Sequence, residues 1–167
     1  MEESFEKAVE YYKKAAEMGY DVAQCDLGYM YEHGMGVEQS YEKAVEWYSK
    51  SAEQGYPRAQ NNLGLLYHKG LGVEESFEKA FELYMEAASG ADTDAANNVG
   101  IMYKNGLGVE QSDEKAVKWF RLAADIGLPM GEYNLGRMYE RGLGVEQSYE
   151  KALELFRSSA ESCNPRA

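Results

Sequence analysis

The chain repeats itself every 36 residues, and this period constrains its fold more than any other feature. A skeleton of an apolar residue, a glycine, a tyrosine, a glycine-rich loop and a serine-led segment recurs at residues 27–44, 63–80, 99–116 and 135–152. A half copy opens the chain at residues 4–8. A fixed period of this length is typical of stacked helical repeats, in which each unit packs only on its neighbours. We therefore predict an all-α chain of antiparallel helix hairpins without strands.

Two helices are predicted in each repeat, and we name them helix A and helix B. A serine precedes each B helix and suits the N-cap, while glycines suit left-handed positions where helices end. Proline at Pro57 and Pro129 suits the first position of an A helix, which needs no N–H. The predicted A helices cover residues 21–33, 57–69, 93–105 and 129–141. The predicted B helices begin at Phe5, with Ser4 as N-cap, and at Tyr41, Phe77, Asp113 and Tyr149.

These helices group into one array over residues 1–167. It comprises a lone B helix at 4–19, four A–B repeats and the start of a further A helix at 164–167. The four repeats cover residues 20–55, 56–91, 92–127 and 128–163. The third junction differs, because its glycine lies one place earlier in SGADTDA. We predict that the preceding B helix ends sooner there, with Asp92 or Thr93 as the next N-cap.

Small residues on each helix predict close helix packing. A mid-helix glycine costs about 1 kcal/mol against alanine, so its recurrence at one A position indicates that the paired helix approaches closely. These glycines are Gly28, Gly64, Gly100 and Gly136. The valine of each loop is predicted to turn inward. Aromatic residues at helical spacing are predicted to form the core.

Composition and charge exclude several classes of function. The net charge of −12 opposes binding to nucleic acid or to an anionic membrane surface. No apolar run approaches the roughly 20 residues of a membrane span. The acidic, amphipathic N-terminus does not resemble a signal peptide, so a cytoplasmic location is expected. Cys25 and Cys163 lie too many repeats apart for a disulfide, which predicts two free thiols.

No residue pattern predicts catalysis, a metal or a cofactor. His33 and His68 lack cysteine or carboxylate at ligand spacing, and we interpret them as exposed residues near helix ends. The loop glycines follow a helix rather than a strand, so the dinucleotide-binding interpretation fails. The serines occur chiefly as helix caps and not in a nucleophile motif. We therefore expect a protein that is not an enzyme.

The repeat unit resembles a known family. Its pattern A-x-x-x-L-G-x-x-Y-x-x-G-x-G-V-x-x-S-x-E-K-A is similar to the Sel-one-like repeat (SLR), a relative of the tetratricopeptide repeat, over the whole chain. The resemblance implies a right-handed α-solenoid that acts as an adaptor or scaffold in protein complexes. Secreted members carry a disulfide in each hairpin, and this sequence lacks those cysteine pairs.

The resemblance also implies a concave groove lined by A helices, which would bind a partner protein or peptide. The predicted groove also includes Cys25, Asn61 and Asn97. The partner-binding residues that we select are Asp26, Tyr29, His33, Arg58, Asn62, Lys69, Asn98, Lys104, Tyr133, Asn134, Arg137 and Arg141. The recurrent asparagines could hold the backbone of an extended peptide or stabilise their own helix neighbours. Both interpretations stay open.

Charge suggests the nature of the partner. The predicted groove carries five basic and four acidic side chains, although the whole chain is strongly acidic. Such a groove could accept an acidic segment or a C-terminal carboxylate. The alternatives are a self-associating array that stacks end to end, and a regulatory fragment of a larger protein.

Overall fold

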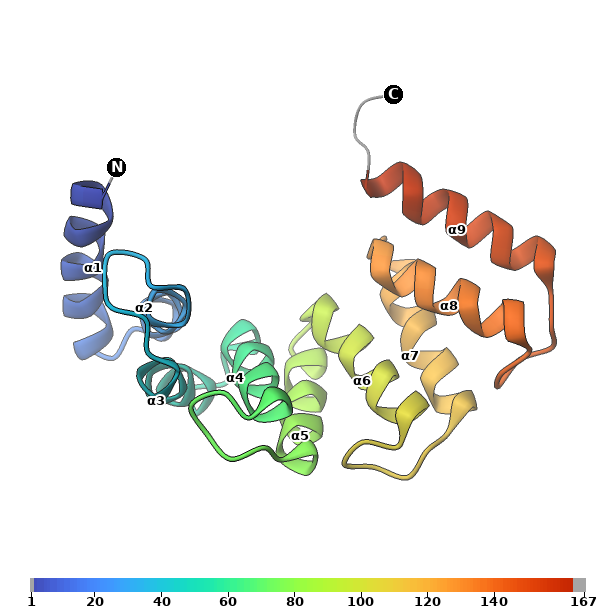
Figure 1. Ribbon diagram of the computed structural model, residues 1–167, viewed down its shortest axis with the longest axis horizontal. Helices are drawn as coiled ribbons and strands as arrows, with labels where there is room; N and C mark the ends of the chain where they lie inside the picture. Colours follow the sequence, from blue (N-terminus) through green and yellow to red (C-terminus); the bar gives the residue numbers. More distant parts are fainter. Residues whose placement is uncertain (1, 164–167) are drawn as a thin grey trace. The chain divides into compact units, whose positions relative to one another are not determined.

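A computed structural model describes the backbone of residues 2–163 and the side chains of residues 9–162. Over this range the chain forms nine α-helices and no strand, which confirms the predicted all-α repeat fold (Figure 1). The helices are α1 (Glu2–Glu17), α2 (Asp21–His33), α3 (Tyr41–Ala52), α4 (Pro57–Lys69), α5 (Phe77–Ser89), α6 (Thr93–Asn105), α7 (Asp113–Asp125), α8 (Pro129–Arg141) and α9 (Tyr149–Cys163). The predicted start of a further A helix at 164–167 lies outside the described residues.

The helix boundaries follow the local signals in the sequence. All four A helices, α2, α4, α6 and α8, have the predicted bounds. The hydroxyl oxygens of Ser40, Ser76, Ser112 and Ser148 each accept a hydrogen bond of 3.3 Å from the backbone N–H three residues later. The predicted N-cap at Ser4 is wrong, because α1 begins at Glu2 and Ser4 lies inside the helix. The cap bonds explain why the other B helices begin where they do.

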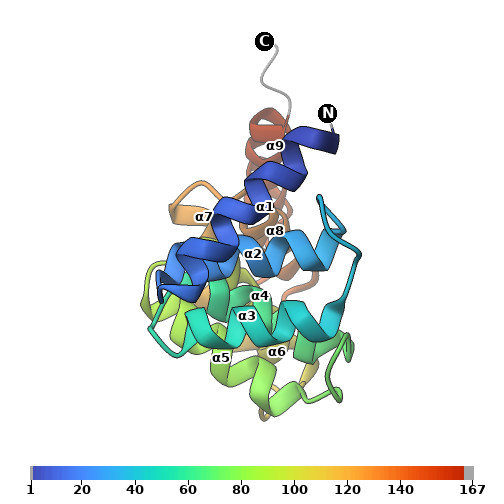
Figure 2. The same ribbon diagram turned by 90° about the vertical axis from the view of Figure 1, so that its left-hand side faces the viewer.

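The helices form two compact units. Unit 1 covers residues 1–92 with α1 to α5, and unit 2 covers residues 93–167 with α6 to α9. Within each unit, every helix packs on the next helix along the chain. Figure 2 shows α1, α2 and α3 of unit 1 lying side by side. Helices α2, α4 and α8 are therefore each packed between two B helices.

Each mid-helix glycine of an A helix lies against an aromatic ring of the following B helix. A Cβ atom on Gly28 would lie 2.7 Å from the Tyr48 ring, and one on Gly64 would lie 2.8 Å from the Tyr84 ring. Phe120 and Phe156 lie in the same way against Gly100 and Gly136. The predicted close approach is confirmed, and an aromatic side chain makes it.

The second glycine of the A–B loop has a role that the sequence analysis did not identify. Gly72 has a φ of +69°, and a Cβ atom there would overlap the backbone at the start of α3, 2.6 Å from the nitrogen of Glu42. Gly144 rests in the same way on the start of α7 in unit 2. Each of these loops therefore sits on the backbone of the preceding B helix, and only glycine fits there.

The third junction differs from its prediction. Helix α5 ends at Ser89, the position that corresponds to Asp125 at the end of α7, so the prediction of an earlier end is wrong. The displaced glycine instead leaves Ala91 in the left-handed region with a φ of +67°, where the other turns have glycine. A Cβ atom on Gly90 would overlap the ring of Pro57, which accounts for the glycine at that place. The predicted N-cap at Thr93 is wrong, because α6 begins at that residue, and the N-cap at Asp92 stays a prediction.

Candidate functional site

The A helices present one stripe of side chains to solvent, which we call the A-helix face. It comprises the second, sixth, ninth and thirteenth residues of each A helix, a spacing that lies on one side of a helix. In unit 1 the face is formed by Val22, Asp26, Tyr29 and His33 of α2 and by Arg58, Asn62, Leu65 and Lys69 of α4. In unit 2 it is formed by Asp94, Asn98, Ile101 and Asn105 of α6 and by Met130, Asn134, Arg137 and Arg141 of α8.

All twelve predicted partner-binding residues are exposed or half-buried. Ten of them belong to the A-helix face, and Lys104 and Tyr133 lie beside it. Three other residues that were predicted to line the groove are buried and do not reach the A-helix face. They are Cys25, Asn61 and Asn97. Asn97 shows the reason, because its Oδ1 accepts a hydrogen bond of 2.8 Å from the side-chain amide of Asn134 on the next A helix. The side chain at this helix position is therefore held between neighbouring A helices.

In unit 1, Arg58 connects the faces of two A helices. Its Nη1 lies 3.7 Å from Oδ1 of Asp26, and its guanidinium lies 5.8 Å from the centre of the Tyr29 ring. Tyr29 in turn stacks on His33 with the ring centres 4.1 Å apart. Burial raises the pKa of Asp26, and the positive charge of Arg58 partly opposes that shift. This face is an ordered row of alternating charge and aromatic surface.

A polar cluster lies beneath the face of unit 1. Tyr48 reaches in from α3, and its hydroxyl donates a 2.7 Å hydrogen bond to Oε2 of Glu32 on α2. Burial and the bond to Glu32 raise the pKa of Tyr48. Burial also raises the pKa of the neighbouring Cys25 thiol to about 12, which disfavours the thiolate form that acts as a nucleophile. From the sequence, the aromatic residues at helical spacing, Tyr48 among them, were predicted only to form the core. The change from tyrosine at 48 and 84 to phenylalanine at 120 and 156 was the available signal for a role of the hydroxyl group.

An apolar hollow adjoins the face of unit 1. It has a volume of about 520 Å³ between α1 and the N-terminal half of α2. Its lining is mainly apolar and aromatic, with one carboxyl group at the edge. The lining residues are Tyr11, Tyr12, Ala15, Tyr20, Val22, Ala23 and Asp26. A hollow of this kind suits an apolar side chain beside a charged or polar group.

The face of unit 2 is richer in arginine. Nη1 of Arg137 donates to the hydroxyl of Tyr133 at 3.2 Å, and its Nε lies 3.1 Å from Oε2 of Glu140. Arg141 lies one turn further along α8 and is exposed. These side chains form a basic and aromatic patch towards the C-terminal end of α8.

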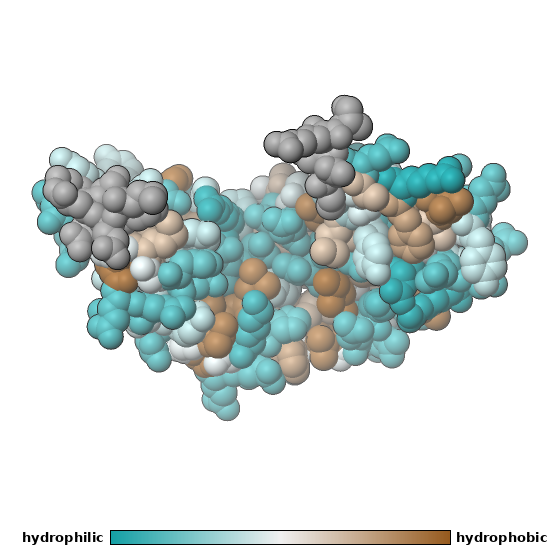
Figure 3. Space-filling view, turned by 45° about the horizontal axis from the view of Figure 1, so that its top comes forward, coloured by the Kyte–Doolittle hydropathy of each residue, from teal (hydrophilic) through white to brown (hydrophobic). Residues whose placement is uncertain are grey.

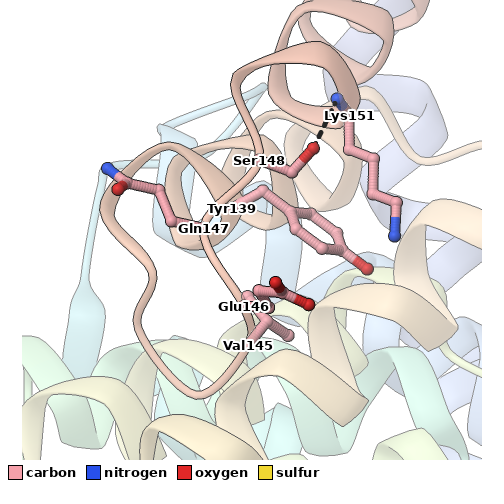
Figure 4. Close-up of a pocket in the computed structure, with 6 residues that line it drawn as sticks. All are labelled: Tyr139, Val145, Glu146, Gln147, Ser148 and Lys151. Carbon is pink, nitrogen blue, oxygen red and sulfur yellow. Dashed lines mark hydrogen bonds between the residues drawn. The ribbon is translucent and has the colours of Figure 1, made fainter.

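A second hollow lies at the loop before α9. It has a volume of about 370 Å³ and is lined by Tyr139, Val145, Glu146, Gln147, Ser148 and Lys151. Figure 4 shows Tyr139, Glu146 and Lys151 directed to the same side and Gln147 directed away. The ammonium group of Lys151 lies 5.2 Å from the centre of the Tyr139 ring, and the corresponding lysine–tyrosine pairs of the other three repeats have the same arrangement. This contact is a structural part of the repeat.

The described residues contain no group of three or more potential ligands that could hold a metal ion. His33 is exposed as predicted. His68 is not: it is half-buried, with its ring 5.4 Å from that of Phe77, and burial lowers its pKa. None of the helices in the described part of the chain has the length and apolar character needed to cross a membrane. The face of the molecule seen in Figure 3 is largely hydrophilic, with separate apolar patches.

Two solved structures match almost the whole chain. A Sel1 repeat protein from Oxalobacter formigenes is 33% identical, with a TM-score of 0.89 over 95% of this chain and 65% of that one. A protective antigen of uropathogenic Escherichia coli strains with an SLR fold is 40% identical, with a TM-score of 0.88 over 95% of this chain and 34% of that one. The chain thus spans about two thirds and one third of the length of these two proteins.

A more distant match is the cysteine-rich protein B of Helicobacter pylori. It is 28% identical, with a TM-score of 0.57 over 76% of this chain and 91% of that one. No curated protein matched the chain. The family model described as Sel1 repeat matches residues 1–20, 21–56, 57–92, 93–128 and 129–162. With repeats that run through almost all of its length, the chain belongs to the Sel1 repeat family.

Proposed function

We propose that this chain is a non-catalytic scaffold that binds a partner protein or peptide along its A-helix faces. Sel1 repeat proteins are generally protein-interaction scaffolds. One observation supports the A-helix faces as the binding surface. Among the described residues, the A helices have four large apolar side chains that are exposed: Val22, Tyr29, Met130 and Tyr133. All four lie on the A-helix face or beside it, and exposed aromatic and methionine side chains are common at protein interfaces.

The charges on the faces support an acidic partner segment. Arg58 and Arg137 are already paired with Asp26 and Glu140. Lys69 and Arg141, at the last position of each face, have no carboxylate within salt-bridge distance among the described residues. A partner with carboxylate groups, including a free C-terminus, would supply the negative charges that Lys69 and Arg141 lack nearby.

The asparagines support an extended partner conformation. Asn134 uses one amide hydrogen for Asn97, and the rest of its half-buried amide stays available for the backbone of a bound peptide. Asn62 and Asn98 hold the same helix position. For Asn134 the two interpretations are therefore compatible, because one amide can join neighbouring helices and also contact a partner.

Binding of a peptide library with acidic C-termini tests this function. We expect Lys69→Ala and Arg141→Ala to lower affinity for the selected peptides by about threefold to tenfold each, because charge-assisted hydrogen bonds are lost. Lys118→Ala is the matched control, since Lys118 is an exposed cation on a B helix.

Two results would contradict the proposal. One is equal binding of peptides whose C-terminus is amidated and whose acidic residues are neutral. The other is equal loss of affinity in the Lys118→Ala control, which would show that overall charge rather than the A-helix face attracts the peptide.

A further inference from the structure

A hollow of about 460 Å³ lies between α3, α4 and α5, which all belong to unit 1. We call it the α3–α5 hollow. Ala52 and Leu63, which are buried, and the half-buried Leu83 form its apolar lining. Leu63 and Gln60 reach it from α4, at the seventh and fourth positions of that helix. These positions lie on the side of α4 opposite to the A-helix face, so the hollow is separate from that face.

The preceding repeat fills the corresponding place with tryptophan. Trp47 of α3 packs against a core that includes Ala16 and Leu27, the counterparts of the two buried residues of the hollow. Leu83 holds the position of Trp47 in the next repeat and packs against the core in the same way. Because leucine is much smaller than tryptophan, space remains beside it.

A second short side chain opens the hollow from α3. Ser49 lines it, whereas every other B helix has a long side chain at this position. Those side chains are Lys13, Met85, Arg121 and Arg157. Among the pairs of successive B helices, only α3 and α5 combine a short residue at the first position with leucine at the second. The hollow therefore arises from residues that depart from the repeat.

The charge beside the hollow is reversed relative to the preceding repeat. Glu86 holds the position of Lys50. The ammonium group of Lys50 lies 4.1 Å from the centre of the Trp47 ring and 2.6 Å from a carboxylate oxygen of Glu46. Glu86 and Glu53 both line the hollow, and neither has a cationic group within salt-bridge distance among the described residues. Carboxylates and open space thus replace a lysine and an aromatic ring.

A buried amide adds another acceptor to the lining. Gln60 is only 6% exposed, and its Nε2 donates a 2.9 Å hydrogen bond to Oε2 of Glu86. In the preceding repeat, Oε1 of the counterpart Gln24 accepts a 2.7 Å hydrogen bond from Gln54. The counterpart of Gln54 is Gly90, which has no side chain, and within the described residues no donor bonds to Oε1 of Gln60. The hollow therefore has acceptors that lack a donor.

We propose that the α3–α5 hollow binds a lysine side chain of a partner protein. The methylene stem of that lysine packs on Leu63 and Leu83, and its ammonium group donates to Glu53, Glu86 and Oε1 of Gln60, which all line the hollow. Lysine combines a long apolar stem with a compact cation that has three donors, and this matches an apolar lining with three acceptor groups. A protein side chain is favoured over a free amine because Sel1 repeat proteins are generally protein-interaction scaffolds.

Titration of the whole chain with two short peptides tests this site. Both have blocked ends and consist of glycine and serine around one central residue, which is lysine in the first peptide and norleucine in the second. In ¹⁵N–¹H spectra we expect the lysine peptide to shift the side-chain amide of Gln60 and the backbone amide of Gly55, with a Kd on the order of 1 mM. The norleucine peptide should bind at least about threefold more weakly, because it keeps the apolar stem and lacks the ammonium group.

Variants of the hollow provide the matched comparison. Glu86→Gln should lower the affinity for the lysine peptide about threefold to tenfold, because a charge-assisted hydrogen bond is lost. Glu82→Gln is the control, since Glu82 is an exposed glutamate of the same helix that does not line the hollow. Leu83→Trp introduces the residue of the preceding repeat and should abolish binding by filling the space. Glu86→Lys should also abolish it by supplying the cation from the chain itself, and circular dichroism checks that each variant folds.

Four results would overturn the proposal. They are no saturable shift at about 10 mM lysine peptide, equal binding of the norleucine peptide, equal weakening by Glu82→Gln, and unchanged binding by folded Leu83→Trp or Glu86→Lys. Equal weakening by Glu82→Gln would show that the overall negative charge attracts the peptide. Lys69→Ala, which tests the A-helix face, should leave the affinity for the lysine peptide unchanged, so each of the two proposals can fail without the other.

Discussion

At the scale of single residues, Tyr48 and Tyr84 hold the same repeat position but differ in their hydroxyl groups. Both rings are buried against a glycine of the paired A helix. The Tyr48 hydroxyl bonds to Glu32, whereas the Tyr84 hydroxyl is buried without a hydrogen-bond partner in the described structure. The residue that corresponds to Glu32 is His68, and its ring centre lies 6.4 Å from that of Tyr84. The identity of this one A-helix residue therefore goes with the state of the hydroxyl: with Glu32 the tyrosine hydroxyl is hydrogen-bonded, and with His68 it is not.

This difference predicts opposite effects of the same substitution. Tyr48→Phe should lower the free energy of unfolding by about 1 kcal/mol, because it removes a hydrogen bond to a carboxylate. Tyr84→Phe should leave it unchanged or raise it by about 1 kcal/mol, because an unsatisfied buried hydroxyl is removed. Chemical denaturation of both variants measures the two effects. Destabilisation by Tyr84→Phe equal to that of Tyr48→Phe would contradict this account. Phe120 and Phe156 show that the position accepts a ring without the hydroxyl group.

At the scale of elements, the turn from a B helix to the next A helix depends on one left-handed residue. Gly19, Gly55 and Gly127 have φ values of +92°, +82° and +78°, and Ala91 holds the same place with +67°. A left-handed backbone costs an L-residue roughly 1–2 kcal/mol, while glycine loses more entropy on folding. The third turn is therefore strained relative to the other turns.

We expect Ala91→Gly to raise the free energy of unfolding by about 0.5–1 kcal/mol, as measured by denaturation. Gly127→Ala is the matched control, because no atom lies within 4 Å of the Cβ atom it would add. Its effect is therefore conformational, and it should destabilise the chain by a similar amount. Destabilisation by Ala91→Gly would show that the alanine side chain makes contacts that outweigh its backbone strain.

At the scale of the whole molecule, each helix is stabilised only by the neighbours on which it packs. Helix α3 packs on α2 and α4, and α8 packs on α7 and α9. Among the described residues, α1 packs chiefly on α2 and α9 packs chiefly on α8. In a repeat array, stability is approximately a sum over such neighbouring interfaces.

Hydrogen exchange should therefore differ along the chain. We expect the amides of α3 and α8 to exchange more slowly than those of α1 and α9, because a helix with one partner opens at a lower free energy. Mass spectrometry of peptic fragments measures this. Uniform protection over all nine helices would instead indicate that the chain opens only as a single cooperative unit.

Much of the fold could be predicted from the sequence by itself. The 36-residue period determined the number and order of the helices, and the serines, prolines and left-handed glycines determined most of their ends. These signals are local, because a cap or a turn is formed by residues a few places apart in the chain. The failures were local too: α1 begins before Ser4, and α5 keeps its length although its glycine is displaced.

Only the tertiary structure decided which side chains meet between repeats. In the structure, the buried Asn97 accepts a hydrogen bond from Asn134, and the Tyr48 hydroxyl donates one to Glu32. Gly72 contacts the backbone at the start of α3. A repeating sequence shows that a position recurs, but a contact between repeats depends on how two different helices are oriented about each other. Residues of one helix that are adjacent in sequence, such as Asn97 and Asn98, point to different surroundings, and only the packing of the neighbouring helix determines which of them is buried.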